Sequence, residues 1–116
     1  MKSIYILLFF IGISTLKVEK IFYEKLSDAA ISLTKDKVEY DGKYFSIKYP
    51  NGDVPKNKGV CTDVLIRAYR KLGIDLQKEV HEDMKNNFSK YPKIWGLKKP
   101  DTNIDHRRVP NLQVFF

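Results

Sequence analysis

The chain has 116 residues, which is enough for one small domain and too few for two independent cores. Hydrophobic residues make up 43% of it and charged residues 30%, a balance that excludes an intrinsically disordered chain. The formal charge of +7 favours anionic partners, although the basic residues are spread along the chain without forming a dense block.

The first segment is similar to a secretory signal, because Lys2 is followed by an uncharged apolar run from Ile4 to Ile13. A run of about ten residues is shorter than the roughly 20 that cross a bilayer as a helix. We predict a signal peptide or short membrane anchor over residues 1–16, and hence an exported protein, periplasmic or extracellular, with N-terminal membrane contact. The alternative is a buried strand or helix of a cytosolic domain.

The segment after this leader has helical periodicity. Five apolar residues recur at the spacing of one helix face: Phe22, Leu26, Ala29, Ala30 and Leu33. Charged residues lie on the other faces. The pattern predicts an amphipathic helix that needs a core to cover it.

Asp41-Gly42 stands between two short β-prone stretches and predicts a hairpin. A two-residue type I′ turn needs positive φ at both central residues, which Asp-Gly favours. This turn would place Val38 opposite Phe45, and strand alternation would put Phe45 and Ile47 on one face.

Residues 50–53 predict a turn that ends the hairpin, and an irregular loop leads from there to a helix that begins near Cys61. This helix has an apolar stripe formed by Val64, Leu65, Ala68 and Leu72. Basic residues in its last turn and Gly73 just beyond predict where it ends.

A second helix is predicted to follow at once, with Asp75 as its cap. Its apolar residues recur every four positions: Leu76, Val80, Met84 and Phe88. The short loop between the two helices favours their packing as a helical hairpin. The tail has little periodicity until residues 112–116, which predict the beginning of a strand.

Cys61 is the only cysteine, and two interpretations of it remain open. At the start of a helix, unsatisfied amides and the helix dipole favour the reactive thiolate, and its own amide can serve as an oxyanion donor. Gly59 leaves room there for a substrate. In the other interpretation, Cys61 is a small apolar residue on the stripe of the helix and is buried in the core.

A cysteine nucleophile needs a base, and the chain contains two histidines. His106 lies in a polar loop, where Asp105 can orient its imidazole. His81 lies within the second predicted helix. Both also fit the surface or capping roles that histidines often have.

No metal or cofactor site is predicted. One cysteine and two distant histidines give no local ligand pair, and no glycine-rich phosphate loop is present. Aromatic and basic residues in the tail are compatible with base stacking, but an exported protein seldom meets nucleic acid. We therefore expect no nucleic-acid partner.

Three blocks, GVCTDVLIRAYR, VHEDM and NIDHRRVPNL, follow one another within residues 38–116. With them, the chain resembles the bacterial family catalogued as domain of unknown function 1287. The resemblance implies an exported protein with an α+β, papain-like fold of the NlpC type, related to cysteine peptidases and amidases that cut cell-wall peptides. In that fold the cysteine begins a helix packed against an antiparallel sheet, and Cys61 matches this nucleophile position.

The resemblance also implies that the chain is truncated. Members of the family continue beyond the point that matches Phe115 and Phe116, into further strands and a histidine-containing strand motif. We therefore expect residues 17–116 to form the N-terminal part of a papain-like domain, with helices and a hairpin but without most of the antiparallel sheet.

The function implied is a cysteine peptidase or amidase acting on peptide amide bonds of the cell wall, inactive if its catalytic histidine is absent. Cys61 is then the nucleophile, His106 a substitute base or substrate contact, and Asp105 the orienting residue. The alternative is a non-enzymatic basic module of the cell envelope, which binds anionic wall polymer or a membrane surface.

Overall fold

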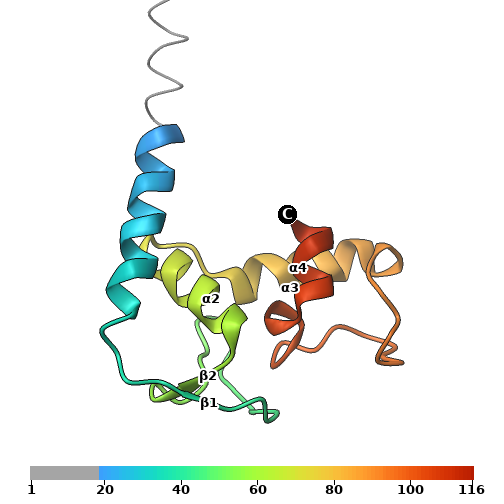
Figure 1. Ribbon diagram of the computed structural model, residues 1–116. Coiled ribbons are helices and arrows are strands. Elements are labelled where there is room, and N and C mark those ends of the chain that lie inside the picture. Colours follow the sequence, from blue (N-terminus) through green and yellow to red (C-terminus); the bar gives the residue numbers. More distant parts are fainter. Residues whose placement is uncertain (1–18) are drawn as a thin grey trace, which may run out of the picture.

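The structure is a computed structural model, which describes residues 19–116 (Figure 1). The predicted leader over residues 1–16 lies outside the described residues. Residues 19–33 are helical and are called the first helix. The elements that follow are β1 (Glu39–Tyr40), β2 (Lys58–Gly59), α2 (Cys61–Lys71), α3 (Leu76–Asn87), the 3-10 turns η1 (Phe88–Lys90) and η2 (Asp105–Arg107), and α4 (Val109–Phe115).

The apolar core lies on one side of α3. Its buried residues are Val80, Met84, Tyr91 and Leu112, against which Leu65, Phe88 and Phe115 pack. The predicted four-residue spacing along α3 is confirmed, because an α-helix returns to nearly the same face every four residues. The predicted cap is confirmed as well, since the amide of Gln77 donates to Asp75 Oδ1 at 3.1 Å.

Helix α2 begins and ends where the sequence predicts, with Gly73 at φ +82° just beyond its last turn. Its buried face, however, differs from the predicted stripe. The buried residues of α2 are Thr62, Asp63, Ile66 and Ala68, whereas Val64 remains 47% exposed. The first turn of α2 therefore packs against a polar partner, and part of its apolar stripe faces outward.

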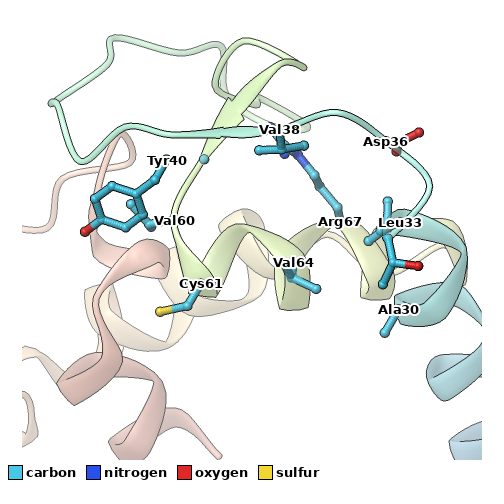
Figure 2. Close-up of a pocket in the computed structure, with 11 residues that line it drawn as sticks. Ala30, Leu33, Asp36, Val38, Tyr40, Val60, Cys61, Val64 and Arg67 are labelled. Atoms are coloured by element: carbon cyan, nitrogen blue, oxygen red, sulfur yellow. The ribbon is translucent and has the colours of Figure 1, made fainter.

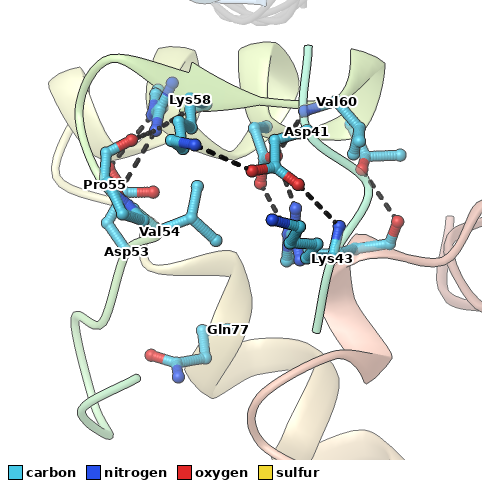
Figure 3. Close-up of polar contacts among 12 residues, drawn as sticks. Asp41, Lys43, Asp53, Val54, Pro55, Lys58, Val60 and Gln77 are labelled. Carbon is cyan, nitrogen blue, oxygen red and sulfur yellow. Dashed lines mark hydrogen bonds and ion pairs between the residues drawn. The ribbon is translucent and has the colours of Figure 1, made fainter. Parts of the chain in front are cut away.

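The hairpin predicted around Asp41-Gly42 is wrong. β1 pairs instead with β2 in parallel, with Glu39 opposite Lys58 and Tyr40 opposite Gly59. Figure 3 shows the contacts of the Asp41 side chain, which accepts a hydrogen bond from the Lys43 amide at 3.0 Å and forms an ion pair with Lys58 Nζ at 3.0 Å. The Asp41 side chain thus joins the 41–43 turn to β2.

The strand predicted over residues 112–116 is also wrong, because these residues belong to α4 and its C-cap. Pro110 lies in the first turn of α4, where a helix amide has no intrahelical acceptor to lose. Leu112 on the inner face joins the core. The described residues are therefore helices with one small parallel sheet, which is compatible with the predicted α+β class.

Candidate active site around Cys61

Cys61 is the first residue of α2, and its thiol is exposed and free. The interpretation of Cys61 as a buried core residue is therefore wrong. A helix leaves its first amides without intrahelical acceptors. Asp63 accepts one of them, because the Val60 amide donates to Asp63 Oδ2 at 2.7 Å, and the Asp63 amide donates to the Val60 carbonyl at 3.0 Å. The amides of Cys61 and Thr62 are thus the candidates for binding an oxyanion.

A buried ion pair holds this first turn in place. Arg107 of η2 donates from Nε and Nη2 to the two carboxylate oxygens of Asp63, both at 2.9 Å, and each side chain is only 3% exposed. Thr62 Oγ1 also donates to the carbonyl of Arg107 at 2.8 Å. Bidentate arginine pairs fix orientation as well as distance. We call these three residues the Asp63 clamp.

Gly59 packs directly against the clamp. A Cβ at this position would lie 3.2 Å from both Cβ and Oδ2 of Asp63 and 3.3 Å from Arg67 Nη1. The guanidinium of Arg67 is itself fixed, because it donates to Asp53 at 3.0 Å and to the Lys58 carbonyl at 2.9 Å. The glycine therefore lets β2 approach α2 closely, rather than simply leaving space for a substrate.

A mostly apolar hollow of about 280 Å³ opens beside Cys61 (Figure 2). Val38 and Tyr40 line it from the segment that includes β1, and Ala30 and Leu33 line it from the end of the first helix. Cys61 also lines two neighbouring hollows, one toward α4 and one along the first helix. The thiol thus lies where three apolar depressions meet on the outward face of α2.

The structure places His106 away from these hollows. His106 lies in η2 and is buried, and burial together with the nearby Arg107 charge lowers its pKa to about 4. None of the three hollows that Cys61 lines includes His106. The η2 turn does contact α2, but its hydrogen bonds reach the buried Thr62 and Asp63 rather than the exposed thiol.

Asp105 is next to His106 in sequence but bonds elsewhere. Asp105 Oδ2 accepts the Asp101 amide at 2.5 Å, and the Asp105 carbonyl accepts Asn111 Nδ2 at 3.1 Å. Burial raises the pKa of the Asp105 carboxyl. The geometry thus gives Asp105 the task of joining the 101–105 turn to α4.

His81 lies in α3, half-buried, with its ring edge-on to Tyr49 at a centroid distance of 4.9 Å. Burial lowers its pKa. Like His106, it lines none of the three hollows around Cys61.

Metal ligation has no support among residues 19–116, where no three His, Cys, Asp or Glu side chains gather around a common point. Over the same range, no helix combines the length and the apolar character needed to cross a bilayer.

The Asp63 clamp was not predicted from the sequence. One signal was available, since an acidic residue at the third position of a helix commonly bonds the amide of the cap. Its pairing with Arg107 was not visible, because 44 residues separate the two.

The chain matches one family model and one curated protein. A family model described as "Domain of unknown function (DUF1287)" matches residues 27–116. The uncharacterized protein YijF of Escherichia coli strain K12 is 54% identical over 91 residues, which are 78% of this chain and 44% of that protein. The chain therefore spans less than half the length of the curated relative it matches. No solved structure matches it.

Proposed function

The chain belongs to the family catalogued as domain of unknown function 1287, and from this premise we propose that it is an exported cysteine peptidase or amidase with Cys61 as nucleophile. The observation that supports this most is the exposed thiol at the first position of α2, beside an apolar hollow. A papain-like fold of the NlpC type, with α2 as the nucleophile helix, is part of the proposal.

In the proposed reaction, the Cys61 thiolate attacks the carbonyl carbon of a peptide amide. The carbonyl oxygen becomes an oxyanion, which the amides of Cys61 and Thr62 are placed to stabilise at the start of α2. The C–N bond then breaks, the amine leaves with a proton from a general acid, and a thioester remains on Cys61. Water attacks this thioester, releasing the acid product and restoring the thiol.

The Asp63 clamp supports this chemistry by fixing the first turn of α2 on its buried side. An unpaired carboxylate so near the first turn would oppose an oxyanion, but Asp63 is paired with Arg107 and bonded to the Val60 amide. Its charge is thus offset locally, and the backbone that carries the candidate donor amides is fixed. Preorganised donors cost no rearrangement at the moment of reaction.

The two histidines of the chain are poorly placed to serve as the general base, because neither lines a hollow beside Cys61. His106 is buried, and with a pKa lowered to about 4 it is a weak base at neutral pH. Turnover of an ordinary amide by this chain alone is therefore expected to be negligible. An activated ester is less demanding, because an aryloxide leaves without a proton from a general acid, and a thiolate formed by ionisation in water attacks it without a general base.

The substrate proposed is a peptide of the bacterial cell wall. The hollow beside Cys61 is lined by Val38, Val64 and Leu33, and it is close to the lower size limit of ordinary ligand pockets. Such a surface suits a small apolar side chain on the acyl side of the bond, and alanine has this character.

The test uses a peptide ester with a p-nitrophenolate leaving group, N-acetyl-alanine p-nitrophenyl ester, with the full chain. Because nitrophenolate leaves as an anion, the assay needs no general acid, and at alkaline pH the thiolate that attacks forms without a general base. We expect a burst of one nitrophenolate per chain, an acetyl-alanyl group on Cys61 by mass spectrometry, and slow release afterwards.

The matched control moves the thiol by one turn, in the double variant Cys61→Ser, Val64→Cys. Val64 lines the same hollow and is similarly exposed, but it lies beyond the start of α2. We expect acylation of this variant at least tenfold slower than that of the native chain. Equal rates would refute the proposal, because the helix start would then confer no reactivity.

A further inference from the structure

Although basic residues are spread along the chain, its net positive charge is greatest in one stretch, because that stretch has no acidic residues. Between Asp83 and Asp101 there is no acidic residue, but there are five lysines: Lys85, Lys90, Lys93, Lys98 and Lys99. All five are exposed. Because the whole chain carries a formal charge of +7, this stretch, residues 84–100, holds most of the excess. We call it the lysine segment.

Two large apolar residues stand at the tip of the lysine segment. The Gly96 amide donates to the Lys93 carbonyl at 3.2 Å and closes a tight turn, with Gly96 at φ +67°. Ile94 and Trp95 are the central residues of this turn. Ile94 is 71% exposed and Trp95 is 36% exposed, and one side of the Trp95 ring lies on the guanidinium of Arg108 at 4.0 Å.

We propose that the lysine segment binds an anionic membrane surface, with Ile94 and Trp95 entering the head-group region and the lysines meeting lipid phosphates. Tryptophan favours the membrane interface because its ring is apolar and its N–H is polar. Lysines near a negatively charged leaflet are attracted electrostatically, and their flexible stems let the ammonium stay at head-group level. The binding does not depend on Cys61 chemistry.

The apolar tip favours lipid over a soluble polyanion. A charged polymer gains contacts from the lysines alone and offers nothing to an exposed isoleucine. A bilayer gives Ile94 an apolar phase just beneath a layer of phosphates, which the neighbouring lysines can contact. With only two inserting residues, the binding is expected to be reversible and sensitive to salt.

Trp95 is the only tryptophan, so its fluorescence reports this turn even when the apolar N-terminal run touches lipid as well. The experiment titrates the full chain with vesicles of equal parts phosphatidylglycerol and phosphatidylcholine at low salt. We expect a blue shift of the emission, quenching when the lipid chains are brominated, and loss of both at high salt or on pure phosphatidylcholine.

Matched variants locate the binding. Ile94→Ser should weaken partition about threefold, and the pair Lys98→Gln, Lys99→Gln about 30-fold. The controls are Ile31→Ser, an isoleucine 60% exposed on the first helix, and the pair Lys35→Gln, Lys56→Gln, which removes the same charge elsewhere. Both controls should change partition less than twofold.

Three results would overturn the proposal. One is an unshifted Trp95 emission on anionic vesicles. Another is a blue shift that grows with protein concentration in the absence of vesicles, which indicates association between copies of the chain. The third is equal weakening by the control lysine pair, since only the net charge would then matter. The Cys61→Ser variant should bind like the native chain, which separates this test from that of the peptidase.

Discussion

On its inner face, α2 carries Thr62, Asp63 and Ile66, all buried, whereas on its outer face Cys61 and Val64 are exposed. The inner face begins with polar groups whose bonds to η2 fix the first turn. The outer face is apolar and borders the three hollows around Cys61. The difference shows that contacts on the inner face alone can fix the first turn of a helix. A thiol in the same turn then stays exposed and can react or bind.

The largest expected effect comes from breaking the inner face at Arg107. Arg107→Met leaves the Asp63 carboxylate buried without its partner, and we expect a loss of about 3–5 kcal/mol in the free energy of unfolding. Urea denaturation followed by circular dichroism measures it. The double variant Arg107→Met, Asp63→Leu should recover much of the loss. A loss below about 1 kcal/mol for the single variant would show that the pair is not buried as described.

A direct comparison of the two faces uses Ile66 and Val64. Ile66 is 1% exposed, so Ile66→Ala should cost about 2–4 kcal/mol through lost burial and the cavity left behind. Val64→Ala, two residues away on the outer face, should stay within about 0.5 kcal/mol. Both are measured in the same urea titration. Similar costs at the two positions would mean that the outer face is covered in solution.

The free energy of unfolding should also depend on pH through His106, which lies in the η2 turn that contacts the inner face of α2. Burial lowers the pKa of His106 from 6.5 to about 4, so the unfolded chain binds the proton more readily than the folded one. Stability is then lost as pH falls from about 6.5 toward 4, by about 2 kcal/mol between pH 7.5 and pH 5. His106→Gln should remove this loss.

The measurement for His106 is the difference between the two pH profiles of unfolding free energy, rather than the stability of either protein at one pH. Asp105 acts in the opposite direction. Its pKa is raised in the folded chain, so the folded chain takes up this proton more readily than the unfolded one, and stability increases as pH falls. Asp105 is present in both proteins, so its effect cancels in the difference. Parallel profiles would contradict the burial of the His106 ring.

The smallest expected effect is that of Cys61→Ala, which should change the free energy of unfolding by less than about 0.5 kcal/mol. The thiol is exposed, so its removal leaves no cavity. Thermal and urea unfolding of the variant against the native chain provide the check. A loss of more than about 1.5 kcal/mol in the free energy of unfolding would indicate that Cys61 is buried in the core.

The helices could be predicted from local signals. Asp75 capped α3 as expected, and the apolar spacing from Leu76 onward identified the face that enters the core. In both cases the signal and the contact lie within one element. The face of α2 could not be predicted in the same way, because its partner is the polar η2 turn, more than 40 residues later.

The predicted hairpin and the predicted last strand are wrong because contacts with residues distant in the sequence outweigh the local pattern. Asp41-Gly42 is a good hairpin motif, but the Lys43 amide and the Lys58 ammonium bind the Asp41 side chain, and β1 pairs with β2. The stretch from Leu112 to Phe116 is rich in strand formers, yet packing of Leu112 into the core favours a helix. For the candidate site, the sequence predicted that a helix begins near Cys61, while the clamp at the start of this helix was not predicted.

The parallel pair of β1 and β2 makes the two sides of the hollow beside Cys61 unequal in stiffness. The α2 side is fixed by buried charge, but β1 has only two residues, with Tyr40 exposed. The Glu39 amide bonds the Asn57 carbonyl at 2.8 Å, and the Asp41 amide bonds the Gly59 carbonyl at 3.0 Å. Local opening needs little free energy where so few bonds must break. The β1 side of the hollow is therefore expected to open at a lower free-energy cost than the α2 side, which the Asp63 clamp fixes.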